Sequence, residues 1–187
     1  MYSKTQQKFL LKLARDAIKN RLLTGRNLKI DESKIDEQLK ENRGVFVTIT
    51  IGSQLRGCIG HIVPIQELYK DVAENAINAA FDDPRFYPLS KDELDLIKIE
   101  ISILSLPQKI DYKNTQDLLS KIIPLKDGII LKKGFFQATY LPQVWEDLTD
   151  KDAFLSSLCL KAGLPSDEWK TGTLEVSRYS VEKFEEN

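Results

Sequence analysis

The chain has 187 residues, and its 27 Lys and Arg side chains almost balance its 28 Asp and Glu side chains, for a formal net charge of −1. A chain of this length forms one domain, or two small lobes, without a disulfide or metal, and the balanced charge argues against broad nucleic-acid binding. No apolar run reaches the ~20 residues that span a bilayer, and only two cysteines are present, so we expect a cytoplasmic protein that does not bind membranes.

The first half of the sequence predicts a helix, a β-hairpin and a second helix. Apolar residues at three- and four-residue spacing predict a helix over residues 10–22, ended by Gly25. Residues 45–51 and 55–62 alternate as strands do, with a short turn between them. A proline in the first turn and an apolar, alanine-rich stripe predict a helix over residues 64–81.

The second half repeats both kinds of pattern. A capping box of Ser90 and Glu93 predicts a short helix, and residues 97–106 read as a strand with isoleucines on one face and Glu100 on the other. A helix over residues 114–123, a hairpin over 129–141, a helix from about 150 to 162 and a strand over 171–178 follow. The mixture predicts an α+β fold built on a mixed or largely antiparallel sheet with packed helices.

One stretch stands out chemically: the hexapeptide Leu55-Arg56-Gly57-Cys58-Ile59-Gly60, followed directly by His61, the only histidine. Glycine lets a ligand or a second backbone approach closely, and Arg56 is a neighbour that favours a thiolate at Cys58. In a regular strand Arg56 and Cys58 share one face, while Leu55, Gly57 and Ile59 share the other with His61.

Cys58 has two interpretations. It is either a small buried hydrophobe, or a nucleophile, redox thiol or covalent carrier. His61 is the candidate imidazole for it, but strand alternation places the two on opposite faces. Cys58 and His61 supply only two ligands, so no metal site is predicted. Cys159 lies on the apolar side of a predicted helix and is assigned to the core.

Other polar residues also have alternative roles. Glu100 and Arg56 form either a partly buried ion pair or a substrate clamp beside Cys58. Asn75 and Arg85 belong either to the same cleft or to helix and turn anchors. The sequence contains no Walker loop and no G-x-G-x-x-G motif, so it leaves the cofactor unknown.

The hexapeptide resembles the signature of the AMMECR domain family, and the resemblance extends from about Gly44 towards the C-terminus. It implies a single domain over residues 1–187, with an α+β fold in two lobes and the hexapeptide lining a cleft. Further segments that resemble the family are Gly44-Val45-Phe46-Val47-Thr48, Glu74-Asn75-Ala76, Asp83-Pro84-Arg85-Phe86, Glu100-Ile101-Ser102, Asp127-Gly128, Leu141-Pro142-Gln143-Val144 and Lys161-Ala162-Gly163-Leu164.

The resemblance implies no established reaction. Microbial members, of the AmmeMemoRadiSam system protein A type, often accompany genes for Memo-like and radical SAM proteins, which implies a shared pathway. Two function classes follow: a cysteine-using enzyme or enzyme component acting on a small molecule or protein, and a non-catalytic binding or adaptor module. The candidate catalytic residues are Cys58, Arg56, Glu100 and His61, and the candidate ligand-binding residues are Leu55, Gly57, Ile59, Gly60, Asn75 and Arg85.

Overall fold

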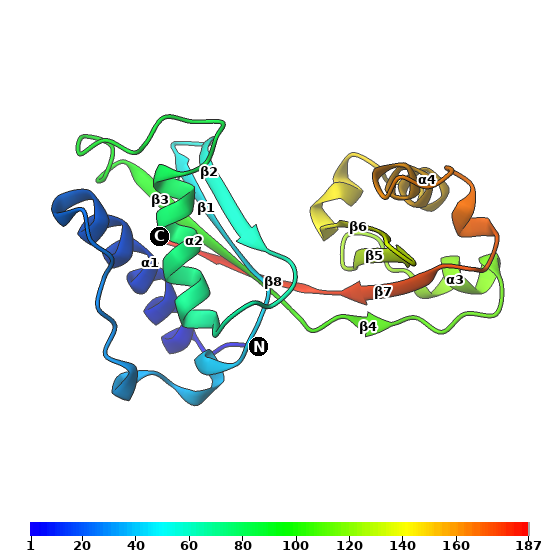
Figure 1. The fold of residues 1–187 in the computed structure, drawn as a ribbon, viewed down its shortest axis with the longest axis horizontal. Helices are drawn as coiled ribbons and strands as arrows, with labels where there is room; N and C mark the ends of the chain where they lie inside the picture. Colours follow the sequence, from blue (N-terminus) through cyan, green and yellow to red (C-terminus); the bar gives the residue numbers. More distant parts are fainter. Residues whose placement is uncertain (187) are drawn as a thin grey trace. The chain divides into compact units, whose positions relative to one another are not determined.

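A computed structural model describes residues 1–186, which fall into two compact units (Figure 1). The N-terminal unit contains Met1–Leu104 and the segment from Glu182 onward, and the C-terminal unit contains Ser105–Val181. Each unit combines helices with a four-stranded sheet around its own hydrophobic core. The expected α+β class is confirmed, and a cleft between two lobes stays a prediction.

In the N-terminal unit, helices α1 and α2 cover one face of a sheet with the strand order β2-β1-β3-β8 (Figure 1). The buried side chains of β1 alternate with half-buried ones, as expected for a strand with one face on a core. The elements are α1 (Lys4–Thr24), two 3-10 helices (Glu32–Lys34 and Glu37–Lys40), β1 (Val45–Ile51), β2 (Gln54–His61), α2 (Leu68–Phe81), β3 (Ile97–Leu104) and β8 (Val181–Glu185).

The first helix and the hairpin are confirmed. Ser3 and Gln6 form a capping box at the start of α1, which satisfies amide groups that have no helical partner there. Gly25 ends the helix with a φ of 70°, a left-handed conformation that glycine adopts without strain.

Two predicted helix starts are wrong. The helix expected over residues 64–81 begins only at Leu68, after Glu67. Ser90 and Glu93 do not open a helix, because residues 91–96 form turns. The Glu93 carboxylate does accept from the Ser90 amide at 2.8 Å, but it also binds an arginine of β2. A tertiary ion pair therefore uses the side chain that the sequence pattern assigned to a cap.

The C-terminal unit has a sheet with the order β4-β7-β5-β6. Its core includes a stacked pair, Trp145 and Phe154, with ring centroids 3.6 Å apart. Cys159 is fully buried in the same core, as expected. The elements are β4 (Gln108–Lys109), α3 (Thr115–Lys121), β5 (Gly128–Lys133), β6 (Phe136–Tyr140), a 3-10 helix (Pro142–Glu146), α4 (Lys151–Lys161), a 3-10 helix (Glu168–Lys170) and β7 (Glu175–Tyr179).

Strand β8 is the main element that the sequence did not predict. It follows β7 after Ser180 alone and joins the sheet of the N-terminal unit beside β3. The acidic residues in and directly after β8 obscured its strand pattern, yet they have specific partners. Glu182 accepts from the Tyr2 amide at 2.9 Å, and Glu186, directly after the strand, binds the Arg15 guanidinium.

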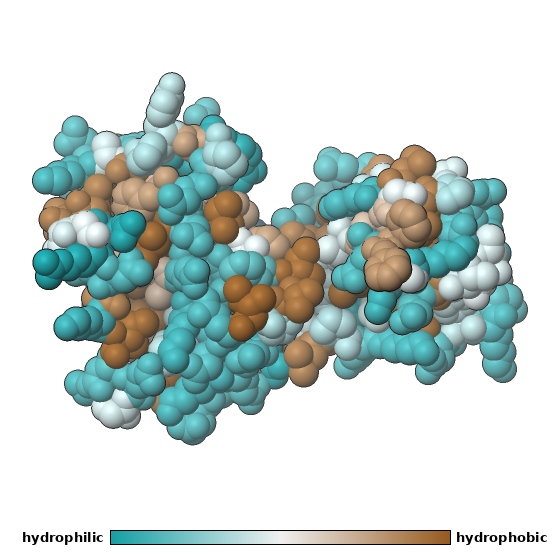
Figure 2. Space-filling view, in the orientation of Figure 1, coloured by the Kyte–Doolittle hydropathy of each residue, from teal (hydrophilic) through white to brown (hydrophobic). Residues whose placement is uncertain are grey.

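The molecular surface is mostly hydrophilic on the face shown in Figure 2, with separate hydrophobic patches. Among residues 1–186, no helix has the length and apolar character needed to cross a membrane.

Candidate functional site

The hexapeptide lies on β2, an edge strand of the N-terminal sheet. Its pairing with β1 is irregular, because Ile49 pairs with Gly57 whereas Thr50 pairs with Leu55. Arg56 is therefore an extra residue without a partner on β1. This is a β-bulge, which locally breaks the alternation of side chains and re-aims them.

The bulge changes which side chains share a face. Cys58 pairs with Thr48, and Leu55 pairs with Thr50, two residues further along β1. Because residues two apart on a strand face the same way, Leu55 lies on the Cys58 face of the sheet. The expected placing of Leu55 on the face opposite Cys58 is wrong for this reason.

An aspartate and an arginine hold the main chain of Cys58 at the free edge of β2. The Cys58 amide donates to Asp83 Oδ2 at 2.9 Å, and its carbonyl accepts from Arg85 Nη2 at 3.1 Å. Arg85 also donates to both Asp83 oxygens, at 2.9 and 2.7 Å. These bonds, with that from Arg85 foremost, lower the pKa of the Asp83 carboxyl well below its ordinary value. The two side chains thus take the place of a neighbouring strand.

The thiol of Cys58 lies on the sheet face opposite α1 and α2 and is half-buried. Thr48 Oγ1 donates to its sulfur at 3.2 Å. Thr48 in turn pairs with Glu100 on β3, whose carboxylate binds Lys183 Nζ at 2.7 Å. Cys58, Thr48, Glu100 and Lys183 therefore form one polar row across the four strands. Glu100 faces away from the isoleucine side, as expected.

Arg56 binds the loop between α2 and β3. Its guanidinium donates to Glu93 Oε1 at 2.7 Å and to the Tyr87 carbonyl at 2.9 Å. The Arg56 hydrogen bond is the main cause that lowers the pKa of Glu93 from 4.5 to about 2. The predicted pairing of Arg56 with Glu100 is wrong, because Glu93 supplies the carboxylate. The sequence did not predict the Arg56–Glu93 pair, because the two residues are far apart in the chain and Glu93 was assigned to a helix cap.

Both glycines of the hexapeptide are required by packing. A Cβ added to Gly57 would lie 2.0 Å from the Ala79 carbonyl oxygen of α2, and one added to Gly60 would lie 2.5 Å from Phe46 Cδ1. Contacts this short are excluded, so α2 and the Phe46 ring can lie here only against glycine. Ligand contact at these glycines stays a prediction.

His61 lies on the other face of β2, towards α2. It pairs with the fully buried Val45, and its Nδ1 atom is 2.8 Å from Oδ1 of Asp71, which is also fully buried. Nδ2 of Asn75 is 3.3 Å from the same nitrogen. The expectation that Cys58 and His61 face opposite ways is confirmed. Asn75 is buried beside His61, and Arg85 anchors Cys58.

The residues at the site that were not among the sequence candidates include Thr48, Asp71, Asp83, Glu93 and Lys183. The cross-strand register that brings Thr48 to Cys58 depends on the bulge, which no local pattern marks. One local feature of the sequence could have indicated this part of the site: opposite charges two residues apart, at Asp83 and Arg85. Among residues 1–186, no three His, Cys, Asp or Glu side chains gather as a metal-ligand set.

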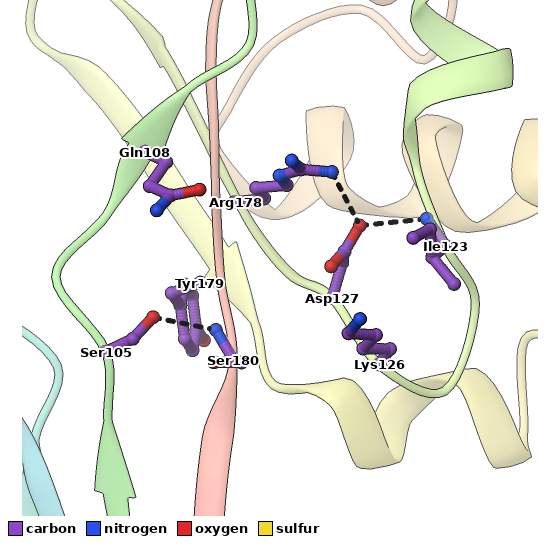
Figure 3. A pocket seen from close by; sticks show the side chains of 8 residues that line it. All are labelled: Ser105, Gln108, Ile123, Lys126, Asp127, Arg178, Tyr179 and Ser180. Carbon is purple, nitrogen blue, oxygen red and sulfur yellow. Dashed lines mark hydrogen bonds and ion pairs between the residues drawn. The ribbon is translucent and has the colours of Figure 1, made fainter. Parts of the chain in front are cut away.

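A separate pocket of about 260 Å³ lies in the C-terminal unit (Figure 3). Arg178 Nη1 is 3.9 Å from Asp127 Oδ2, which also accepts from the Ile123 amide at 2.8 Å. These contacts connect the turn before β5 to β7, so Asp127 and Arg178 already have a structural role. The pocket is lined by Ser105, Gln108, Ile123, Lys126, Asp127, Arg178, Tyr179 and Ser180.

Comparison with known proteins agrees with the resemblance of the hexapeptide. The AMMECR1 family model matches residues 11–184. Protein MK0488 of Methanopyrus kandleri is 42% identical over 182 residues, covering 95% of this chain and 87% of its own. Protein NEQ441 of Nanoarchaeum equitans is also 42% identical, over 180 residues, covering 95% of this chain and 99% of its own.

A solved structure has the same fold. The crystal structure of uncharacterized protein PH0010 from Pyrococcus horikoshii superposes with a TM-score of 0.83 and 36% sequence identity, covering 99% of this chain and 93% of that one. The family model spans nearly the whole chain, including the bulged strand, the loop that clamps it and the return strand β8. The chain belongs to the AMMECR1 family.

Proposed function

We propose that the protein is a cysteine-using enzyme, or a component of one, whose reactive group is the Cys58 thiol. The observation that carries this proposal is that the thiol is half-buried on a polar sheet face while its main chain is fixed on both sides. A rigidly held nucleophile reacts faster because less freedom is lost on reaching the reactive geometry.

The Thr48 hydroxyl supports this role. It donates a hydrogen bond to Cys58 Sγ, which holds the sulfur in place on the polar face of the sheet. The proposed substrate is a small polar molecule, or a modified protein, with an electrophilic carbon. That carbon is a carbonyl carbon: the sulfur electron pair forms the S–C bond, the C=O π bond breaks and its pair goes to the carbonyl oxygen, and the thiol proton goes to solvent.

Glu100 and Lys183 extend the same polar row and would bind polar groups of the substrate. Their carboxylate and ammonium are 2.7 Å apart, so together they offer both an acceptor and donors to a ligand. Arg56 stiffens the bulge through Glu93 and acts on the thiol only through the position of the strand. The proposal places the reaction in the cytoplasm and in the AmmeMemoRadiSam type of pathway.

A binding module is the alternative, and one observation favours it. Among residues 1–186, neither an imidazole nor a carboxylate is hydrogen-bonded to Cys58 Sγ, so no side chain is placed to remove its proton. As a binding module, the protein would bind a peptide or small ligand on the sheet face that carries Cys58, and it would not catalyse a reaction.

Thiol alkylation separates the two functions. In a Cys159→Ala protein, Cys58 is the single thiol, and its rate with iodoacetamide is compared with that of glutathione at the same pH. If Cys58 is an enzyme thiol, its alkylation rate is well above that of glutathione. A Cys58→Ser variant keeps the fold and shows no alkyl adduct in intact-mass spectra. A folded protein whose Cys58 reacts no faster than glutathione supports the binding module and contradicts the proposal.

A further inference from the structure

The polar cluster around His61 has no part in the proposed chemistry at Cys58. We propose that His61 and Asp71 form a separate proton-transfer dyad, which deprotonates a hydroxyl or ammonium group of a small polar substrate. His61 is the base, and Asp71 is a positioning residue. This inference does not depend on whether Cys58 is reactive.

The local structure buries a carboxylate against the ring. Asp71 lies in the first turn of α2, with its amide donating to the Glu67 carbonyl, and its side chain has no exposed surface. Buried carboxylates are rare and need partners. The partners of Asp71 Oδ1 are His61 Nδ1 at 2.8 Å and Gln66 Nε2 at 3.2 Å.

These contacts set the tautomer of the imidazole. A carboxylate only accepts hydrogen bonds, and Asp71 Oδ1 at 2.8 Å is a nearer partner than Asn75 Nδ2 at 3.3 Å, so we assign His61 Nδ1 as the donor to Asp71. In the neutral ring, Nε2 then carries the lone pair. Among residues 1–186, Nε2 has no hydrogen-bond partner, and the His61 side chain is 33% exposed. A buried carboxylate behind a ring with a free outer nitrogen is the arrangement that orients histidine bases in hydrolases.

A second observation indicates a ligand. Asp71 Oδ2 and Asn75 Oδ1 are buried and have no donor among residues 1–186, and both residues have no exposed surface. Leaving a buried acceptor without a donor is costly. Within residues 1–186, the unpartnered atoms of the cluster, which are these two oxygens and His61 Nε2, are all acceptors, and this favours a ligand rich in O–H or N–H groups.

The proton transfer balances within this cluster. Nε2 takes the proton of the substrate hydroxyl or ammonium, and the electron pair of the broken O–H or N–H bond stays on that oxygen or nitrogen. The imidazolium that forms keeps its Nδ1–H on Asp71, whose negative charge stabilises it. Cys58 takes no part, because it faces the opposite side of β2.

Nitrogen-15 NMR tests the dyad directly, because His61 is the only histidine in the chain. In the wild-type protein, the neutral ring should show Nδ1 protonated and Nε2 unprotonated, and Asp71→Asn should lose this preference. Glu74→Gln, which alters the other partner of Gln66, is the matched control and should leave the tautomer unchanged. A wild-type ring protonated at Nε2 would overturn the dyad, even if Asp71→Asn fails to fold.

Two further measurements test the base and its substrate class. Diethyl pyrocarbonate should acylate His61 in the folded wild-type protein, and a folded protein with an inert His61 contradicts the role. Ethanolamine, which carries both a hydroxyl and an ammonium, should shift the ring signals, whereas tetramethylammonium, which has no donors, should not. Equal responses to both compounds, or no response to either, would overturn the proposed substrate class.

Discussion

The position of Cys58 depends on two side chains that are distant from it in sequence. Asp83 and Arg85 bind the amide and carbonyl that an edge strand would otherwise leave open. They also block these groups from pairing with a strand of another molecule, a known hazard of sheet edges. The same pair therefore protects the edge and fixes the thiol.

Replacing Asp83 with asparagine should destabilise the protein. The substitution removes the charge from bonds to the Arg85 guanidinium and to the Cys58 amide, and hydrogen bonds of this kind contribute on the order of 2 kcal/mol. Urea unfolding measures the loss. Asp82→Asn, at the exposed neighbouring position, is the control, and equal midpoints for the two variants would contradict the clamp.

The Thr48 hydroxyl should tune the Cys58 thiol. Thr48→Val keeps the shape of the side chain but removes its donor to sulfur, and we expect alkylation of Cys58 to slow by roughly tenfold, the equivalent of one such hydrogen bond. Iodoacetamide kinetics in the Cys159→Ala background measure the change. An unchanged rate in a folded variant would show that Thr48 does not activate the sulfur.

The Arg56–Glu93 pair should make stability depend on acid pH. The pKa of Glu93 in the folded protein is lowered from 4.5 to about 2, so its contribution is complete above the ordinary pKa and is lost as pH falls towards the folded one. The gap in unfolding free energy between wild type and Glu93→Gln should therefore shrink as pH falls from about 4.5 to about 2. Asp92→Asn, at an exposed position nearby, serves as the control. A gap that stays constant over this range would contradict the pairing.

At the scale of elements, the β-bulge of β2 decides the geometry of the site. Strand alternation predicted the correct faces for Cys58, His61 and Glu100, because each lies in a regular part of its strand. It failed at Leu55, because Arg56 is an extra residue that interrupts the register. A bulge leaves no local sequence pattern here, since it arises from pairing with β1 and from the arginine's contact with a distant loop.

Gly57→Ala should destabilise the contact between β2 and α2. The added Cβ would lie 2.0 Å from the Ala79 carbonyl oxygen, and that oxygen belongs to a helix backbone that has little freedom to move. Overpacking of this kind costs about 1–3 kcal/mol. Thermal unfolding measures the loss, with Ser53→Ala in the exposed hairpin turn as the control. A variant as stable as the control would show that α2 shifts freely along β2.

At the scale of the whole molecule, the apolar stripes of individual helices and strands were predictable from periodicity, whereas the division of the chain between two cores was not. The stripe that holds Cys159 was assigned correctly, and this residue packs in the C-terminal core with Leu155 and Leu158. Strand β8 was missed, because only its long-range partners distinguish Val181–Glu185 from an acidic tail.

Cys159→Ala should lower stability without affecting function. The thiol is fully buried and burial raises its pKa, so it is held as a neutral, small apolar group. Removing it should cost on the order of 1 kcal/mol and leave Cys58 alkylation unchanged, as judged by chemical unfolding and iodoacetamide kinetics. A change in Cys58 reactivity at unchanged stability would overturn the structural assignment.

The return of β8 to the first sheet has a consequence for biosynthesis. A ribosome makes the chain from its N-terminus, so helices α1 and α2 and strands β1–β3 emerge long before the strand that completes their sheet. Until residues 181–186 leave the exit tunnel, the outer edge of β3 has no neighbouring strand. The Arg15 guanidinium also lacks its partner, Glu186. The intervening unit, Ser105–Val181, is continuous in sequence and can fold first. The half of the molecule that is translated first is therefore the half whose sheet is completed last, and during that interval its open edge is exposed to pairing with other strands.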